Sequence, residues 1–306
     1  MNPKSFIASN QKSPWLITAL AVSFPLLFVN ALSESYPMGY AGLFTQMARQ
    51  IADANFQLPI ESPFYGPGGI PFAYPPFGLY LLAILIKVTG KYFFFLRILP
   101  PMLSLISLIP LFYLTLHLSK STLAAGMIVI LTAASPNLYE AHAWAAGMVR
   151  ASAFLFMLCT LYFFVKHNSQ PTLLNLLSAG MLLGLTLLSH LTYFLFCIAW
   201  IGWWTVSSGK FFLRFKDAAI VVLLGLLTSS IWWLTIIFRY GFGVFVKAFN
   251  SHGADSLLSV WQNVPGIFAS FWINLESLTA NIWLFALVVI GVIALVVKKN
   301  LQLILF

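Results

Sequence analysis

Charged residues are scarce in this sequence, and acidic ones are the scarcest. Asp and Glu number 7 among 306 residues, and charged residues of all kinds make up 8% of the chain, against roughly a quarter in ordinary soluble domains. Hydrophobic residues make up 60%, far more apolar surface than a soluble fold of this length can bury. The composition therefore excludes a soluble globular domain and predicts an integral membrane protein.

Other absences narrow the chemistry. The sequence contains no P-loop, no GxGxxG after a strand, no CxxC pair, no HExxH and no GxSxG motif. Nucleotide-driven transport, zinc proteolysis of the HExxH type and α/β-hydrolase chemistry therefore lack support. The two cysteines, Cys159 and Cys197, lie in apolar segments and are predicted to be small buried hydrophobic residues.

Long apolar segments alternate with short polar turns along the chain. A transmembrane helix takes about 20 mostly apolar residues. The segments that approach this length are 14–32, 96–118, 121–137, 148–166, 172–189, 191–207, 218–238 and 279–297. We therefore predict an all-α polytopic membrane protein with about eight transmembrane helices, all in one domain, 1–306. The end at Phe306, soon after an apolar segment, is compatible with a piece of a longer protein.

The segment 33–95 is predicted to be the first extracytoplasmic loop and to be structured. Residues 40–56 repeat apolar residues at helical spacing, with polar residues between them, which predicts an amphipathic helix lying on the membrane. A turn-rich stretch follows at 63–71. A further apolar segment, 73–90, opens with Pro75-Pro76 and either crosses the membrane or lies at its interface.

Basic residues predict the orientation, because cytoplasmic loops carry an excess of Lys and Arg. If 73–90 lies at the interface, the N-terminus shares one side with short turns that hold Lys120, Lys166, Lys210, Arg214, Lys216, Lys298 and Lys299. If it crosses, the basic turn at 210–216 moves outside, so we favour the interfacial alternative and a cytoplasmic N-terminus. The net charge of +9 then reports orientation, and nucleic acid is not an expected partner.

The order of features in the first two thirds of the chain resembles a known superfamily. Glu34 follows the first apolar helix, Tyr74-Pro75-Pro76-Phe77 follows the amphipathic segment, Arg97 lies at the next span, and Ser135-Pro136 begins a later loop. This order resembles the multi-pass glycosyltransferases of the GT-C superfamily and their prokaryotic relatives, including membrane proteins labelled as related to 6-pyruvoyl-tetrahydropterin synthase. The resemblance covers most of residues 14–200.

The resemblance implies a cell-membrane enzyme that transfers a sugar from a polyprenyl-phosphate or polyprenyl-diphosphate donor to an acceptor on the outer face. The lipid-linked sugar donor and membrane lipids are then the expected partners. In the superfamily the acid after the first helix serves as general base or metal ligand and is usually aspartate. This sequence has Glu34 at that place.

Glycosyl transfer needs a carboxylate to deprotonate the acceptor and a cation or metal to stabilise the departing phosphate. Glu34 and Asp53 are the candidate catalytic acids. The candidate substrate-binding residues are Arg97, Arg150, His190 and Tyr74. Glu140 and His142 are candidates to hold a metal or phosphate together with Glu34. The sequence therefore leaves open whether the protein binds a divalent metal or uses no cofactor.

Two other functions stay open. A transporter or flippase for a lipid or amphipathic solute would show paired charges or broken helices at mid-membrane depth, and the apolar segments here are nearly free of charge. A catalytically inactive scaffold of the same fold is the second alternative. Clustering of Glu34 with Arg97, Glu140 or His190 would favour the enzyme over the scaffold.

Overall fold

Helices account for nearly all of the structure, a computed structural model that describes residues 12–62, 69–135, 138–144, 146–207 and 211–250. These residues form eleven helices and one pair of two-residue strands. The predicted all-α class is therefore confirmed for the described part of the chain. The predicted span at 279–297 lies outside it.

Four helices are long and apolar enough to cross a membrane. They are α2 (Lys12–Ser33), α5 (Tyr92–Ser119), α8 (Met148–Ser169) and α11 (Phe211–Tyr240). At about 1.5 Å per residue each exceeds about 30 Å, the thickness of the hydrocarbon core. By length and composition the chain is therefore a multi-pass membrane protein.

Three further apolar segments form helices that are shorter than a membrane span. They are α6 (Thr122–Ala133), α9 (Leu173–Ser189) and α10 (Leu191–Ser207), of 12, 17 and 17 residues. Helices of this length rise about 18–26 Å, against a hydrocarbon core of about 30 Å. The prediction of about eight spans is therefore wrong, because the described residues hold four helices of sufficient length beside shorter apolar ones.

Local sequence features end the short helices. α6 ends at Ala133, and Ser135 precedes a proline, whose ring disfavours helical backbone at the residue before it. His190 separates α9 from α10 because its backbone is extended, with φ −162° and ψ 126°. The predicted segments 172–189 and 191–207 agree with α9 and α10 to within one residue, so these helices were predicted correctly but are too short for a span. The predicted segment 121–137, by contrast, is clearly longer than its helix.

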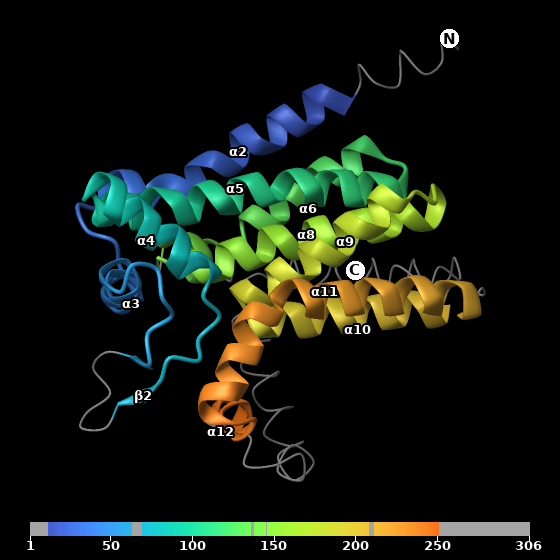
Figure 1. Cartoon of the computed structure of the whole chain (residues 1–306). Helices are drawn as coiled ribbons and strands as arrows, with labels where there is room; N and C mark the ends of the chain where they lie inside the picture. Colours follow the sequence, from blue (N-terminus) through green and yellow to red (C-terminus); the bar gives the residue numbers. More distant parts are fainter. Residues whose placement is uncertain (1–11, 63–68, 136–137, 145, 208–210, 251–306) are drawn as a thin grey trace, which may run out of the picture.

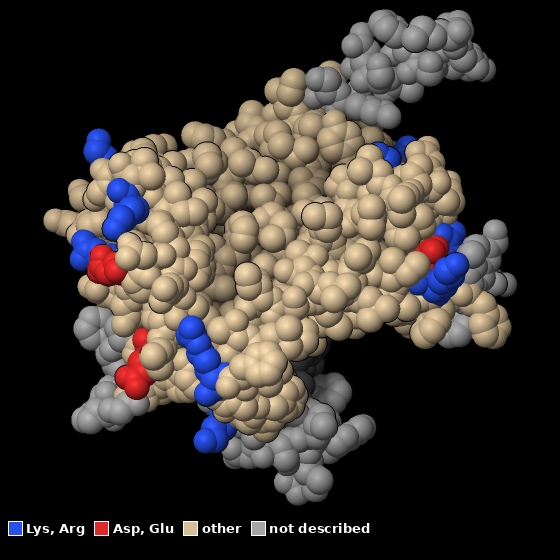
Figure 2. Space-filling model, viewed as in Figure 1, with Lys and Arg blue, Asp and Glu red and all other residues tan. Residues whose placement is uncertain are grey.

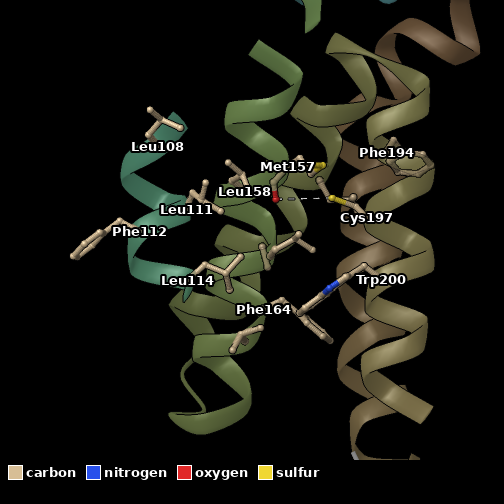
Figure 3. Packing of buried hydrophobic residues seen from close by; sticks show 14 of the residues in the cluster. Leu108, Leu111, Phe112, Leu114, Met157, Leu158, Phe164, Phe194, Cys197 and Trp200 are labelled. Carbon is tan, nitrogen blue, oxygen red and sulfur yellow. Dashed lines mark hydrogen bonds between the residues drawn. The ribbon is translucent and has the colours of Figure 1, made fainter. Parts of the chain in front are cut away.

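The helices pack side by side around α5 and α8 (Figure 1). α2 and α6 lie against α5, α9 lies between α8 and α11, and α10 contacts α8, α9 and α11. Figure 3 shows Leu111 of α5, Leu158 of α8 and Trp200 of α10 in the shared apolar core. Cys197 is fully buried, and its thiol donates to the Met157 carbonyl at 3.9 Å. Its predicted role as a small buried residue is confirmed.

α9 and α11 approach each other closely at glycines. Gly180 and Gly184, one turn apart on α9, both face α11. A Cβ added to Gly184 would lie 2.5 Å from the Thr228 Cβ and 2.7 Å from the Gly225 carbonyl oxygen. Small residues at this spacing let two membrane helices pack backbone to backbone, where dispersion contacts hold them together.

Many hydroxyl groups inside the helices bond to their own backbone. Each donates to the carbonyl one turn earlier, as in Ser104 to Pro100 (2.9 Å), Thr160 to Phe156 (2.8 Å), Thr186 to Leu182 (2.8 Å) and Ser229 to Gly225 (2.9 Å). Placing a hydroxyl without a hydrogen bond in an apolar medium costs on the order of several kcal/mol of free energy. These residues therefore sit in apolar helices without needing a polar neighbour.

The bundle has two charged ends and an uncharged band between them (Figure 2). At the loop end, Arg97 near the start of α5 donates from Nη1 to the Glu34 carbonyl after α2, at 2.9 Å. At the turn end, Arg214 of α11 donates from Nη2 to the Asn168 carbonyl of α8 at 2.7 Å. Charged side chains thus gather where a membrane protein meets water and headgroups.

The segment 33–95 begins and ends at the loop end, because its two flanks meet in the contact between Arg97 and Glu34. Within it, α4 (Phe77–Thr89) has only 13 residues, about 20 Å of helix. The structure therefore supports the interfacial alternative for 73–90. Which end faces the cytoplasm stays a prediction.

The first loop is structured, as predicted, but its amphipathic helix packs on protein. α3 (Ala41–Asp53) buries Phe44, Met47 and Ile51 against α4 in a small second core. Two short strands, β1 (Glu61–Ser62) and β2 (Ile70–Pro71), pair antiparallel. The expectation that this helix lies on the membrane by its apolar face is thus corrected, since α4 covers that face.

The end of α11 fastens the loop to the bundle. Arg239 donates from Nη1 to the Leu58 carbonyl at 2.8 Å, and the Tyr240 hydroxyl donates to the Ile60 carbonyl. The short helix α12 (Gly243–Asn250) follows directly. Residues 180 positions apart in sequence therefore meet at the loop end.

The close approach of α9 and α11 predicts that two glycine-to-alanine variants differ strongly in their free energy of unfolding. Gly184→Ala should lower the free energy of unfolding by about 1–3 kcal/mol, because its methyl group overlaps Thr228 and the Gly225 carbonyl. Gly202→Ala in α10 meets nothing within 4 Å and should be neutral or slightly stabilising. Thermal unfolding in detergent measures both, and equal melting temperatures would contradict the packing.

The two-ended arrangement predicts which single cysteines share a side of the membrane. In a Cys159→Ala/Cys197→Ala background, Glu61→Cys and Lys91→Cys should react with a membrane-impermeant maleimide from the same side of sealed vesicles. Lys120→Cys should react only from the opposite side, because it lies at the turn end. Labelling of Glu61→Cys and Lys91→Cys from opposite sides would show that 73–90 crosses.

Candidate functional site

A pocket lies at the loop end, beside the C-terminal end of α2. It is a shallow depression, open to solvent on one side. Its lining brings together Glu34 after α2, Arg97 of α5 and Trp144 of the π-helix η1 (Tyr139–Trp144), with Tyr36 and Met38 at the side. Two of the predicted site residues, Glu34 and Arg97, therefore share one pocket.

Arg97 holds the backbone of this pocket. Its Nη1 donates to the Glu34 carbonyl at 2.9 Å and is 3.4 Å from the Ser35 carbonyl. Its buried Nε has no hydrogen-bond partner among the described residues. The guanidinium thus fixes where the chain leaves α2, while the exposed Glu34 carboxylate stays available at the pocket.

A buried histidine lies beside the pocket lining. His142 precedes the pocket residues Ala143 and Trp144 in η1 and is 5% exposed. Its Nε2 shares a hydrogen bond with the Tyr193 hydroxyl, and its Nδ1 is buried with no partner in the described part of the chain. The His190 ring lies 5.4 Å from the Tyr193 ring. The predicted residues His142 and His190 thus meet through Tyr193.

Burial keeps His142 neutral. The pKa of His142 is lowered to about 3, chiefly by loss of water on burial and then by the charges of Arg150 and His190. A neutral imidazole in a buried site is a hydrogen-bonding group, not a cation. Any bound anion therefore meets Arg150 or Arg97 and not a charged His142.

Arg150 lies over an aromatic ring at the start of α8. Its guanidinium carbon is 5.0 Å from the centre of the Tyr40 ring, and its Nη2 is 3.4 Å from the Tyr40 hydroxyl. Tyr40, Phe44 and Tyr74 continue as a row of rings with centres 5.7 and 6.1 Å apart. This row of rings links the predicted residue Arg150 to the predicted residue Tyr74 of the first loop. Neither of them lines the pocket.

The other predicted acids lie apart from the pocket. Asp53 ends α3 and is exposed, and Glu140 in η1 is exposed as well. Neither lines the pocket. The described residues hold no group of three or more side chains able to bind a metal. The catalytic role of Asp53 and the metal role of Glu140 and His142 stay predictions.

Three aromatic residues of this region were not singled out by the sequence. Trp144 lines the pocket, Tyr40 lies under Arg150, and Tyr193 joins His142 to His190. One signal existed for Tyr193: it lies three residues after His190, the spacing of neighbours on a helix face. Trp144 had a weaker one, its place two residues after His142.

Comparison with known proteins gives the chain no family. No protein-family model matches it, and no curated protein matches it. The likeness to the GT-C superfamily therefore rests on the short motifs given above, and the function is argued from the site.

The burial of His142 predicts a pH-dependent loss of stability. The pKa of His142 is lower in the folded protein than in the unfolded chain. As the pH falls below about 6.5, the unfolded chain therefore takes up a proton that the folded protein does not. The folded state loses stability in this way until the pH reaches about 3. At about pH 5 this costs about 2 kcal/mol. His142→Gln should therefore show a flatter fall in melting temperature than wild type between about pH 7 and pH 5. Parallel curves for the two proteins would contradict the burial.

Proposed function

We propose that this chain is a membrane glycosyltransferase of the GT-C type, which transfers a sugar from a polyprenyl-phosphate-type donor to an acceptor at the loop end. The observation that carries the proposal is the pocket shared by Glu34 and Arg97. The reaction needs a carboxylate and a cation close together, and here segments 63 residues apart in sequence supply them.

Glu34 is the proposed general base. Its carboxylate takes the proton of an acceptor hydroxyl, the acceptor oxygen bonds to the anomeric carbon, and the bond from that carbon to the phosphate oxygen breaks. The electron pair leaves with the lipid phosphate. A guanidinium nearby stabilises that developing charge, and Arg97, which lines the pocket, is the proposed group.

The surroundings of the pocket suit a lipid-linked donor. Val29 and Leu32, close to the end of α2, are 47% and 68% exposed, and Met38 in the pocket lining is 55% exposed. Exposed apolar side chains of this kind are stable against hydrocarbon. A polyprenyl chain can thus lie along α2 in the bilayer while its phosphate reaches Arg97.

The alternatives receive less support. A transporter predicts paired charges at mid-membrane depth, whereas within the described residues the one ion pair, His167 with Asp217, lies at the turn end. An inactive scaffold accounts for Arg97 as a group that holds the backbone at Glu34, but it gives no reason for the exposed carboxylate of Glu34 beside it. The pocket therefore favours the enzyme.

The proposal predicts that transfer depends on Glu34. In membranes containing the full chain and a panel of radiolabelled polyprenyl-phosphate sugars, Glu34→Gln should reduce transfer at least about 100-fold, the typical effect of removing a general base. Glu61→Gln is the matched control, since Glu61 is an exposed acid of the same loop outside the pocket. It should transfer like wild type.

Two outcomes would contradict this assignment. Transfer that survives Glu34→Gln but falls in Asp53→Asn would move the base to α3. The absence of transfer by wild type with every donor of the panel would remove the enzyme proposal and leave the scaffold.

A further inference from the structure

Three helix ends meet at the turn end and are tied together by polar contacts. Arg214 of α11 donates to the Asn168 side chain and, at 2.7 Å, to its carbonyl. Ser169 of α8 shares a hydrogen bond of 3.0 Å with His117 Nε2 of α5. The ends of α5 and α8 and the start of α11 therefore form one fixed surface.

This surface is strongly positive. It carries Lys120, Lys166, Arg214 and Lys216, and the ammonium groups of Lys120 and Lys166 both act electrostatically on His117. The acid described at this end is Asp217, whose carboxylate lies 3.5 Å from His167. The surface thus holds more cations than the described acids neutralise.

Two of these cations have no protein partner in the described part of the chain. Lys120, at the C-cap of α5, and Lys216, in the first turns of α11, are both exposed, and neither ammonium group makes a hydrogen bond or ion pair there. The loop end differs, because its exposed lysines Lys87 and Lys91 share that end with four of the described acids, Glu34, Asp53, Glu61 and Glu140.

Large apolar side chains surround the same cations. At the start of α11, Phe212 and Phe215 are 88% and 57% exposed, and at the start of α9, Leu173 and Leu174 are 69% and 73% exposed. Cations beside exposed apolar side chains at the ends of apolar helices are typical of the bilayer interface. A soluble polyanion would meet the cations but leave this apolar rim in water.

We propose that the turn end is a docking surface for anionic glycerophospholipids, with Lys120 and Lys216 binding the headgroup phosphates. The acyl chains lie against Phe212, Phe215 and Leu173, so both halves of the lipid are matched. Basic residues near an anionic leaflet each strengthen binding about fivefold. This inference is independent of the proposed glycosyl transfer, since it uses the opposite end of the bundle.

The test is a lipid titration of the full chain in detergent, read by native mass spectrometry. Phosphatidylglycerol should bind wild type more tightly than zwitterionic phosphatidylcholine. Lys120→Gln/Lys216→Gln should weaken phosphatidylglycerol binding about 25-fold, and Lys216→Gln alone about fivefold. The matched control is Lys87→Gln/Lys91→Gln, two exposed lysines of the loop end, which should stay within about twofold of wild type.

Three results would overturn the proposal: equal binding of the two lipids, unchanged binding in Lys216→Gln, or an equal loss in the Lys87→Gln/Lys91→Gln control. Displacement of phosphatidylglycerol by inorganic phosphate at equal concentration would also overturn it, because a site for free phosphate gains nothing from acyl chains. Circular dichroism of each variant checks that its helix content is that of wild type.

Discussion

Hydrocarbon offers no hydrogen bonds, so a chain that crosses it must satisfy every polar group internally. In this bundle the hydroxyls of residues such as Ser104 and Thr160 bond to the preceding turn of their own helices. With these hydroxyls satisfied inside their own helices, the helices associate by shape. The glycine contact of α9 with α11 is that kind of association, and it brings the termini of distant segments to common ends.

The uncharged band also decides where chemistry can lie. Among the described residues, carboxylates, guanidiniums and imidazoles are confined to the two ends, so a reactive group at the loop end must be positioned by the loops and helix termini there. Arg97 does this by holding the backbone around Glu34, and Arg239 does it by holding the backbone at Leu58. Both use a cation at the end of a long helix to fix the first loop.

Much of the fold could be predicted from the sequence, because apolar composition alone marks membrane helices. The segments 14–32, 96–118, 148–166 and 218–238 all fall inside long helices. The number of spans was overestimated for two reasons. Segments of 17 or 18 residues were counted as spans, although helices of that length are shorter than the hydrocarbon core. In addition, α6 ends at Ala133, which a count of apolar residues does not see.

The site was predictable only in part, for a related reason. Glu34 and Arg97 stand out as polar residues at the ends of apolar segments, and the structure places both at one pocket. Their contact was not predictable, since it joins a guanidinium to a backbone carbonyl, which every residue has. The aromatic partners Tyr40, Trp144 and Tyr193 were hidden among many aromatic residues, and only packing shows which of them meet a charged or titratable group.

The form of the contact between Arg97 and Glu34 bears on how the site would work. An ion pair with the guanidinium would compete with an acceptor proton for the Glu34 carboxylate, and it would also occupy the cation. Binding the carbonyl instead fixes the position of the residue and leaves the carboxylate unpaired in the described structure. A glutamate, one methylene longer than aspartate, reaches farther from this fixed backbone than an aspartate at the same place would.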